Sequence, residues 1–169
     1  HQEYWDRQEY TLYNIIDPHD SRPFAIGWYA VFPNDDVFCI AEYPDFQFHG
    51  AGVSRLKPSD YATIIRTTEA QIGKPSDVRI MDPHFGNSPK IGQLPVKEVL
   101  ANEHSLYYID GYNDVQGGHI KVQSLIGDAS TGVRPKFYCF EHCFNHIFAI
   151  SHYAFKQDAS GKPELMHKD

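Results

Sequence analysis

Two stretches decide the fold: YTLYNIIDPH at residues 10–19 and VRIMDPH at residues 78–84. Each is a short run rich in β-branched and aromatic residues that a proline stops, which is the pattern of a buried strand and its end. Each run therefore places a carboxylate, Asp17 or Asp82, at the tip of a core strand. Two carboxylates on neighbouring strand tips repel each other unless a cation lies between them. The pair predicts an oxygen-ligand site for a hard divalent ion, Mg²⁺ or Mn²⁺, that acts on phosphate.

The composition places the chain among globular proteins. Of its 169 residues, 41% are hydrophobic and 14% are aromatic, which excludes global disorder. We expect one domain over residues 1–169, with a loose polar start at 1–9 and a polar tail at 156–169. No apolar stretch approaches the length of a membrane span, so no membrane partner is expected. The net charge of −7 argues against polyanion binding by the whole surface, and leaves a local basic face aided by metal ions.

The three cysteines, Cys39, Cys139 and Cys143, lie in apolar contexts. Their odd number argues against a disulfide framework and favours a reducing compartment. Cys139 and Cys143 together with His142 and His146 offer an alternative, a zinc cluster. The segment lacks a C-x-x-C pair and is flanked by Phe and Tyr, which favours buried core thiols over zinc.

The order of the expected elements predicts the fold class. Three strands at 11–17, 24–32 and 37–42 form an antiparallel meander, because the turn at 33–36 has hairpin chemistry. A helix at 58–72 then leads to a strand at 78–81, and this connection implies parallel pairing with the first strand. Helices and strands alternate afterwards, with helices at 96–101, 115–126 and 144–155 and strands at 106–109 and 136–140. This is the order of the α/β ribonuclease H-like fold, a mixed sheet of three antiparallel strands followed by parallel strands and flanked by helices.

With both aspartates placed, the chain resembles the nuclease domain of the large terminase subunit of tailed bacteriophages. The resemblance covers most of the chain and rests on the order of several motifs. These motifs are DPH at 17–19 followed by RPFAIGW at 22–28, AEY at 41–43, DPHFGN at 82–87, FYCFEHC at 137–143 and KPELMHKD at 162–169.

The resemblance implies a metal-dependent endonuclease that cuts concatemeric viral double-stranded DNA during genome packaging in the host cytoplasm. It also implies three protein partners: an N-terminal ATPase motor domain, the portal and the small terminase subunit. The chain has no G-x-x-x-x-G-K-[ST] loop, so we do not expect it to hydrolyse ATP by itself.

The implied mechanism is two-metal phosphodiester hydrolysis. Asp17 would bridge both ions, Asp82 would hold one, and Asp169 is the residue that matches the family's last carboxylate. Glu42, at the end of the third strand, is either a further metal ligand or base, or a solvated edge carboxylate.

Histidines and basic residues complete the expected site. His19 and His84 follow the two aspartates, and we expect them to lie around the ligands or at the surface rather than to bind the ions. Lys90, Arg55 and Lys57 are candidate contacts to DNA phosphates.

Two other functions fit the same residues. One is a different ribonuclease H-like nuclease, such as a resolvase or transposase core, which shares the carboxylates but not the DPH and RPF pattern. The other is a non-catalytic phage assembly or DNA-binding module that keeps the fold. Metal-dependent nicking of plasmid DNA separates the enzymes from the binding module.

Overall fold

The computed structural model describes residues 9–45, 55–88, 94–112, 114–128 and 130–152. Most of the expected loose start and all of the expected polar tail lie outside these ranges. Lys90 and Asp169 lie outside them as well.

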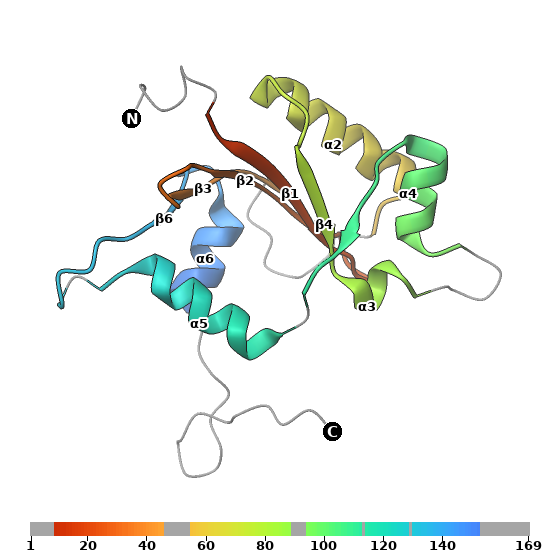
Figure 1. The fold of residues 1–169 in the computed structure, drawn as a ribbon. Helices are drawn as coiled ribbons and strands as arrows, with labels where there is room; N and C mark the ends of the chain where they lie inside the picture. Colours follow the sequence, from red (N-terminus) through yellow and green to blue (C-terminus); the bar gives the residue numbers. More distant parts are fainter. Residues whose placement is uncertain (1–8, 46–54, 89–93, 113, 129, 153–169) are drawn as a thin grey trace, which may run out of the picture.

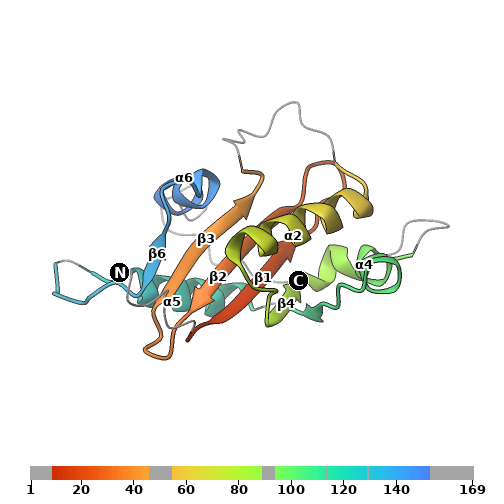
Figure 2. The ribbon, with the colours of Figure 1, turned by 90° about the horizontal axis from the view of Figure 1, so that it is seen from above.

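Six strands form one mixed sheet in the order β5-β4-β1-β2-β3-β6, and Figure 2 shows β6, β3, β2, β1 and β4 side by side. The strands are β1 (Thr11–Asp17), β2 (Ala25–Val31), β3 (Val37–Tyr43), β4 (Val78–Met81), β5 (Ile109–Asp110) and β6 (Phe137–Cys139). The first three pair antiparallel, whereas β4 pairs parallel with β1, β5 with β4, and β6 with β3. The expected meander and the expected parallel contact between the first and fourth strands are confirmed.

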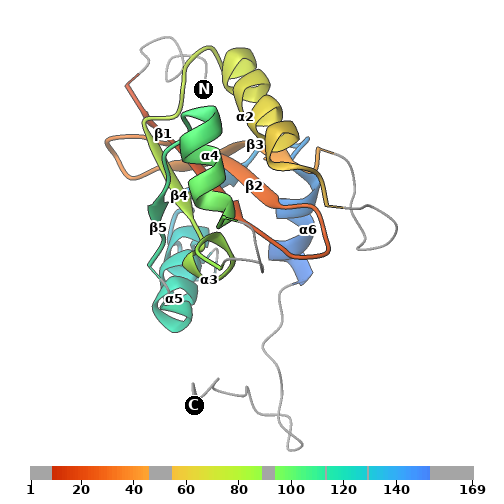
Figure 3. The same cartoon turned by 90° about the vertical axis from the view of Figure 1, so that its right-hand side faces the viewer.

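Helices lie on both faces of this sheet (Figures 1 and 3). One face carries α2 (Pro58–Ile72) and α4 (Val96–His104), and the other carries α5 (Val115–Ile126) and α6 (Phe144–His152). The short helix α3 (Pro83–Gly86) follows β4 directly. Helix α2 begins at Pro58, where proline is preorganised for the first helical position, and ends before Gly73, whose φ of 92° is the left-handed cap that glycine adopts readily.

The main core lies between the sheet and the α2/α4 layer. On β1, Leu12 and Ile16 are fully buried in one cluster with Tyr61, Ile65 and Leu100 from the two helices. The period of two along a strand turns the alternate residues of β1 to the other face. Ile15 there is 37% exposed. Asp17 shares that face, so the α5/α6 side of the sheet stays open near the end of β1.

Several expected element boundaries differ from the structure. Strand β2 is one residue shorter than expected at each end, and β3 is one residue longer at its end. The expected strand at 106–109 is reduced to Ile109–Asp110, because Leu106 donates its N–H to Leu100 O and is used in ending α4. Helix α4 runs on to His104 instead of ending at 101, and β6 is shorter by one residue at each end. Every helix among the described residues is too short or too polar to cross a lipid bilayer.

Candidate active site

The carboxyl ends of β1 and β4 bring Asp17 and Asp82 to the same edge of the sheet. Asp17 is the last residue of β1, and Asp82 directly follows β4. Their strands are in register, since Ile16 lies opposite Met81 and the Asp82 N–H donates to Ile16 O at 3.0 Å. The two aspartates are therefore held next to each other by backbone pairing, as the two apolar runs predict.

Electrostatics at this edge favour a cation. Partial burial and the nearby Asp82 carboxylate raise the pKa of Asp17, while His19 lowers it. Among the described residues, none donates a hydrogen bond to the Asp17 carboxylate or forms an ion pair with it. Asp82 uses one oxygen, Oδ1, to accept the His84 N–H at 2.7 Å, which caps α3. An ionised carboxylate that lacks donors and faces a second carboxylate is stabilised when a cation binds between them.

The two histidines at the edge have structural contacts. His19 Nδ1 accepts the N–H groups of Ser21 and Arg22 at 3.2 and 3.3 Å, so the imidazole holds the turn after β1. The His19 ring also lies 5.8 Å from the ring of Phe85 in α3, and His84 contacts the same ring edge-on at 4.7 Å. Both histidines therefore contact Phe85 and link the β1 turn to α3, and their expected place around bound ions stays a prediction.

Two of the three expected DNA contacts lie beside the same turn. Arg55 and Lys57 line a cavity of about 510 Å³ together with His19, Asp20 and Phe85. The Arg55 guanidinium lies 5.3 Å from the centre of the Phe24 ring. Neither Asp17 nor Asp82 lines this cavity, so it adjoins the aspartate pair rather than containing it. The third expected contact, Lys90, lies outside the described residues.

Glu42 is held by helix α6 instead of pointing at the aspartate pair. Its Oε1 accepts the Asn145 N–H at 2.7 Å, and its Oε2 accepts the His146 N–H at 2.9 Å. The Asn145 amide reaches Oε1 at 3.1 Å, and His146 Nδ1 lies 2.6 Å from Oε2. Burial by itself would raise the pKa of Glu42, but these hydrogen bonds outweigh it and lower that pKa. We infer that Glu42 caps α6, and that its carboxylate is already satisfied by protein donors.

One further carboxylate at this edge, Asp110, is missing from the set that the sequence analysis selected. Asp110 ends β5, which pairs with β4, and lies opposite Met81. Its Oδ1 is 2.5 Å from Lys97 Nζ and accepts from Asn87 Nδ2 at 3.0 Å. These two partners lower the pKa of Asp110. Asp110 also follows an apolar run, LYYI at 106–109, but it lacks the Asp-Pro-His ending that selected Asp17 and Asp82.

Within the described residues, no group of three or more His, Cys, Asp or Glu side chains is arranged to hold a metal ion. The aspartate pair alone supplies too few ligands for a hard divalent ion, which takes six or more. Asp169, the expected third ligand, lies outside the described residues.

The fold is similar to that of the large terminase nuclease domain of bacteriophage SPP1, whose crystal structure contains bound Mn. The two chains share 13% identity with a TM-score of 0.58, over 94% of this chain and 77% of that chain. No protein-family model and no curated protein gives a significant match. The resemblance seen in the sequence is confirmed at the level of the fold, which is the ribonuclease H-like arrangement.

Proposed function

We propose that this chain is a metal-dependent DNA endonuclease domain that cuts concatemeric viral double-stranded DNA during genome packaging. One observation carries the proposal: Asp17 and Asp82 leave neighbouring parallel strands at the same edge and repel each other. The likeness to a terminase nuclease domain that binds Mn supports it.

The residues at the edge fit a hard divalent cation. Carboxylate oxygens are the ligands that Mg²⁺ and Mn²⁺ prefer, whereas zinc favours histidine and cysteine. Asp17 and Asp82 would hold the ions, with Asp169 as the third carboxylate. Bound ions would supply a water of lowered pKa and charge stabilisation for the leaving 3′ oxygen.

The other residues position the substrate. Arg55 and Lys57 carry positive charge beside the turn that follows Asp17, and we assign them to the DNA backbone on one side of the cut. Contacts to phosphate carry no sequence information, so we expect low sequence specificity. The partners on this proposal are double-stranded DNA, an ATPase motor domain, the portal and the small terminase subunit, and the place of action is the host cytoplasm.

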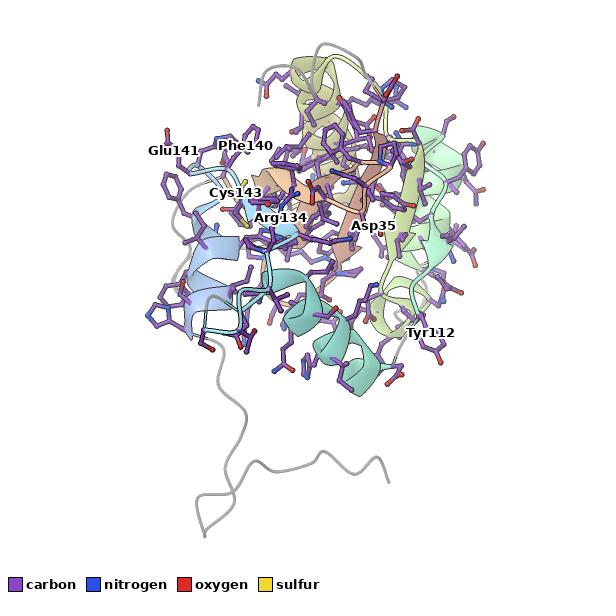
Figure 4. All side chains as sticks on the ribbon, turned by 60° about the vertical axis from the view of Figure 1, so that its left-hand side comes forward. Asp35, Tyr112, Arg134, Phe140, Glu141 and Cys143 are labelled. Carbon is purple, nitrogen blue, oxygen red and sulfur yellow. The ribbon has the colours of Figure 1, made fainter. Side chains whose placement is uncertain are left out.

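Plasmid nicking tests the proposal. Supercoiled DNA should be converted to nicked and linear forms with Mn²⁺ or Mg²⁺ and not with EDTA. Asp17→Asn and Asp82→Asn should each abolish the conversion while circular dichroism shows an intact fold. Asp35→Asn is the matched control, because Asp35 is an 83% exposed carboxylate in the β2–β3 turn (Figure 4). Asn also tolerates the positive φ of 65° at that position. Undiminished nicking by both edge variants would exclude this site.

A further inference from the structure

Three thiols that are far apart in the sequence meet on the α5/α6 side of the sheet. Cys39 and Cys139 occupy directly opposed positions of the parallel strands β3 and β6. Cys143 lies in the turn before α6, where the helix meets the sheet (Figure 4), and its Sγ contacts Cys39 O at 3.6 Å. Cys39 has both other cysteines as neighbours, because it lies opposite Cys139 in the sheet and its carbonyl oxygen accepts from the Cys143 thiol. Cys39 is therefore the central thiol of a chain of three.

The backbone places Cys39 and Cys139 at a separation that a disulfide can span. Paired strands lie about 4.8 Å apart, and the Cα atoms of disulfide-bonded cysteines usually lie about 4.4–6.8 Å apart. All three cysteines are free thiols in this structure. Cys39 and Cys143 are completely buried, whereas Cys139 is only half-buried, so a small oxidant reaches Cys139 first.

The surroundings of Cys39 and Cys139 shift the pKa values of the two thiols in opposite directions. The neighbouring Cys139 and Cys143 thiols, and then burial, raise the pKa of Cys39, so this thiol keeps its proton. The neighbouring Cys39 thiol lowers the pKa of Cys139, and burial opposes this shift. The nearby His146 lowers the same pKa and the Glu42 carboxylate raises it, and the net shift is downward. Cys139 is consequently the thiol with the greater thiolate character, and the thiolate is the form that reacts with oxidants.

We propose that Cys139 and Cys39 form an oxidisable dithiol, a peroxide-modification site separate from the nuclease edge. The Cys139 thiolate attacks one peroxide oxygen, and the O–O bond breaks to give Cys139 sulfenic acid and hydroxide. The Cys39 sulfur then attacks the Cys139 sulfur and forms the S–S bond. The displaced hydroxyl leaves with the Cys39 proton as water. Peroxide is the two-electron oxidant, and both thiols are oxidised together.

Peptide mapping of the intact wild-type chain tests this proposal without any variant. The protein is treated with a small molar excess of hydrogen peroxide, unreacted thiols are alkylated after unfolding, and a non-reducing digest is read by mass spectrometry. We expect one free thiol, at Cys143, and a linked pair of peptides that carry Cys39 and Cys139. Dithiothreitol should restore all three thiols.

Variants identify the attacking thiol. Cys39→Ala should stop at a sulfenic acid on Cys139 that dimedone captures. Cys139→Ser should leave Cys39 unmodified at the same dose, and the matched control Cys143→Ser should still form the link. A Cys39–Cys143 link, dimedone capture on Cys39 or Cys143, or survival of all three thiols would overturn the proposal. So would stoichiometric zinc held by these cysteines in the purified protein. None of these readouts uses DNA cleavage, so failure here leaves the proposed nuclease function untouched.

Discussion

Replacing Glu42 with Gln distinguishes the capping role of this residue from a role as a metal ligand. The side chain is 1% exposed and accepts two backbone N–H groups and two side-chain donors from α6. Gln keeps the shape and one acceptor oxygen but turns an NH₂ group toward a donor. A hydrogen bond to a charged group contributes about 1.5–3 kcal/mol, and an unsatisfied buried donor costs about 1–3 kcal/mol. The four hydrogen bonds share two carboxylate oxygens, so their contributions do not add. We expect the free energy of unfolding to fall by about 3 kcal/mol in total.

Thermal and urea unfolding of the metal-free protein measure this loss. A loss of about 3 kcal/mol corresponds to a fall in Tm of roughly 6–12 °C for a chain of this size. Glu141→Gln is the matched control, since Glu141 is an exposed carboxylate in the turn before α6 (Figure 4) and should change stability by less than about 0.5 kcal/mol.

The pH dependence of unfolding gives an independent check. The folded-state pKa of Glu42 lies below its usual value of 4.5, so its contribution is present above that value and is lost as pH falls through the folded-state pKa. The stability gap between wild type and Glu42→Gln should therefore be widest at neutral pH and narrow in acid. At a temperature where both proteins are folded, Glu42→Gln should still nick DNA. Unchanged stability together with lost nicking would refute the capping role and make Glu42 a ligand.

Three further predictions concern the edge and its surroundings. Asp17→Asn should make the metal-free protein more stable at pH 7. The folded-state pKa of Asp17 is raised, so the stability of the wild type falls as pH rises through that pKa. The denaturation curves of wild type and variant should therefore converge near pH 3, where Asp17 is protonated. Arg55→Ala and Lys57→Ala should each weaken DNA binding and reduce the slope of log K against log salt by about 0.9, whereas Lys136→Ala, beside the β2–β3 turn, should not. Asp169→Asn should weaken Mn²⁺ binding in a metal titration and slow nicking; equal affinity and rate would show that another acid is the third ligand.

The sequence predicts the parts of this fold that local patterns encode. The meander, the β1–β4 contact and the position of Asp17 beside Asp82 all follow from strand runs, turn chemistry and connection length. The place of β6 beside β3 does not follow, because about 90 residues separate the strands and no local signal encodes their pairing. The convergence of Cys39 with Cys139 depends on that pairing, so a view of the cysteines by sequence spacing alone omits Cys39 from the cluster.

Asp17 and Asp110 show why the candidate site required the structure as well as the pattern. Both aspartates end a strand at the same edge, and each follows an apolar run in the sequence. Lys97 Nζ lies 2.5 Å from Asp110 Oδ1, whereas no described residue donates to the Asp17 carboxylate. Lys97 comes from the first turn of α4, 13 residues before Asp110, and only tertiary packing brings the two together. A cation gains most where carboxylates lack a cationic protein partner, so we expect a divalent ion to bind at the end of the edge that holds Asp17 and Asp82.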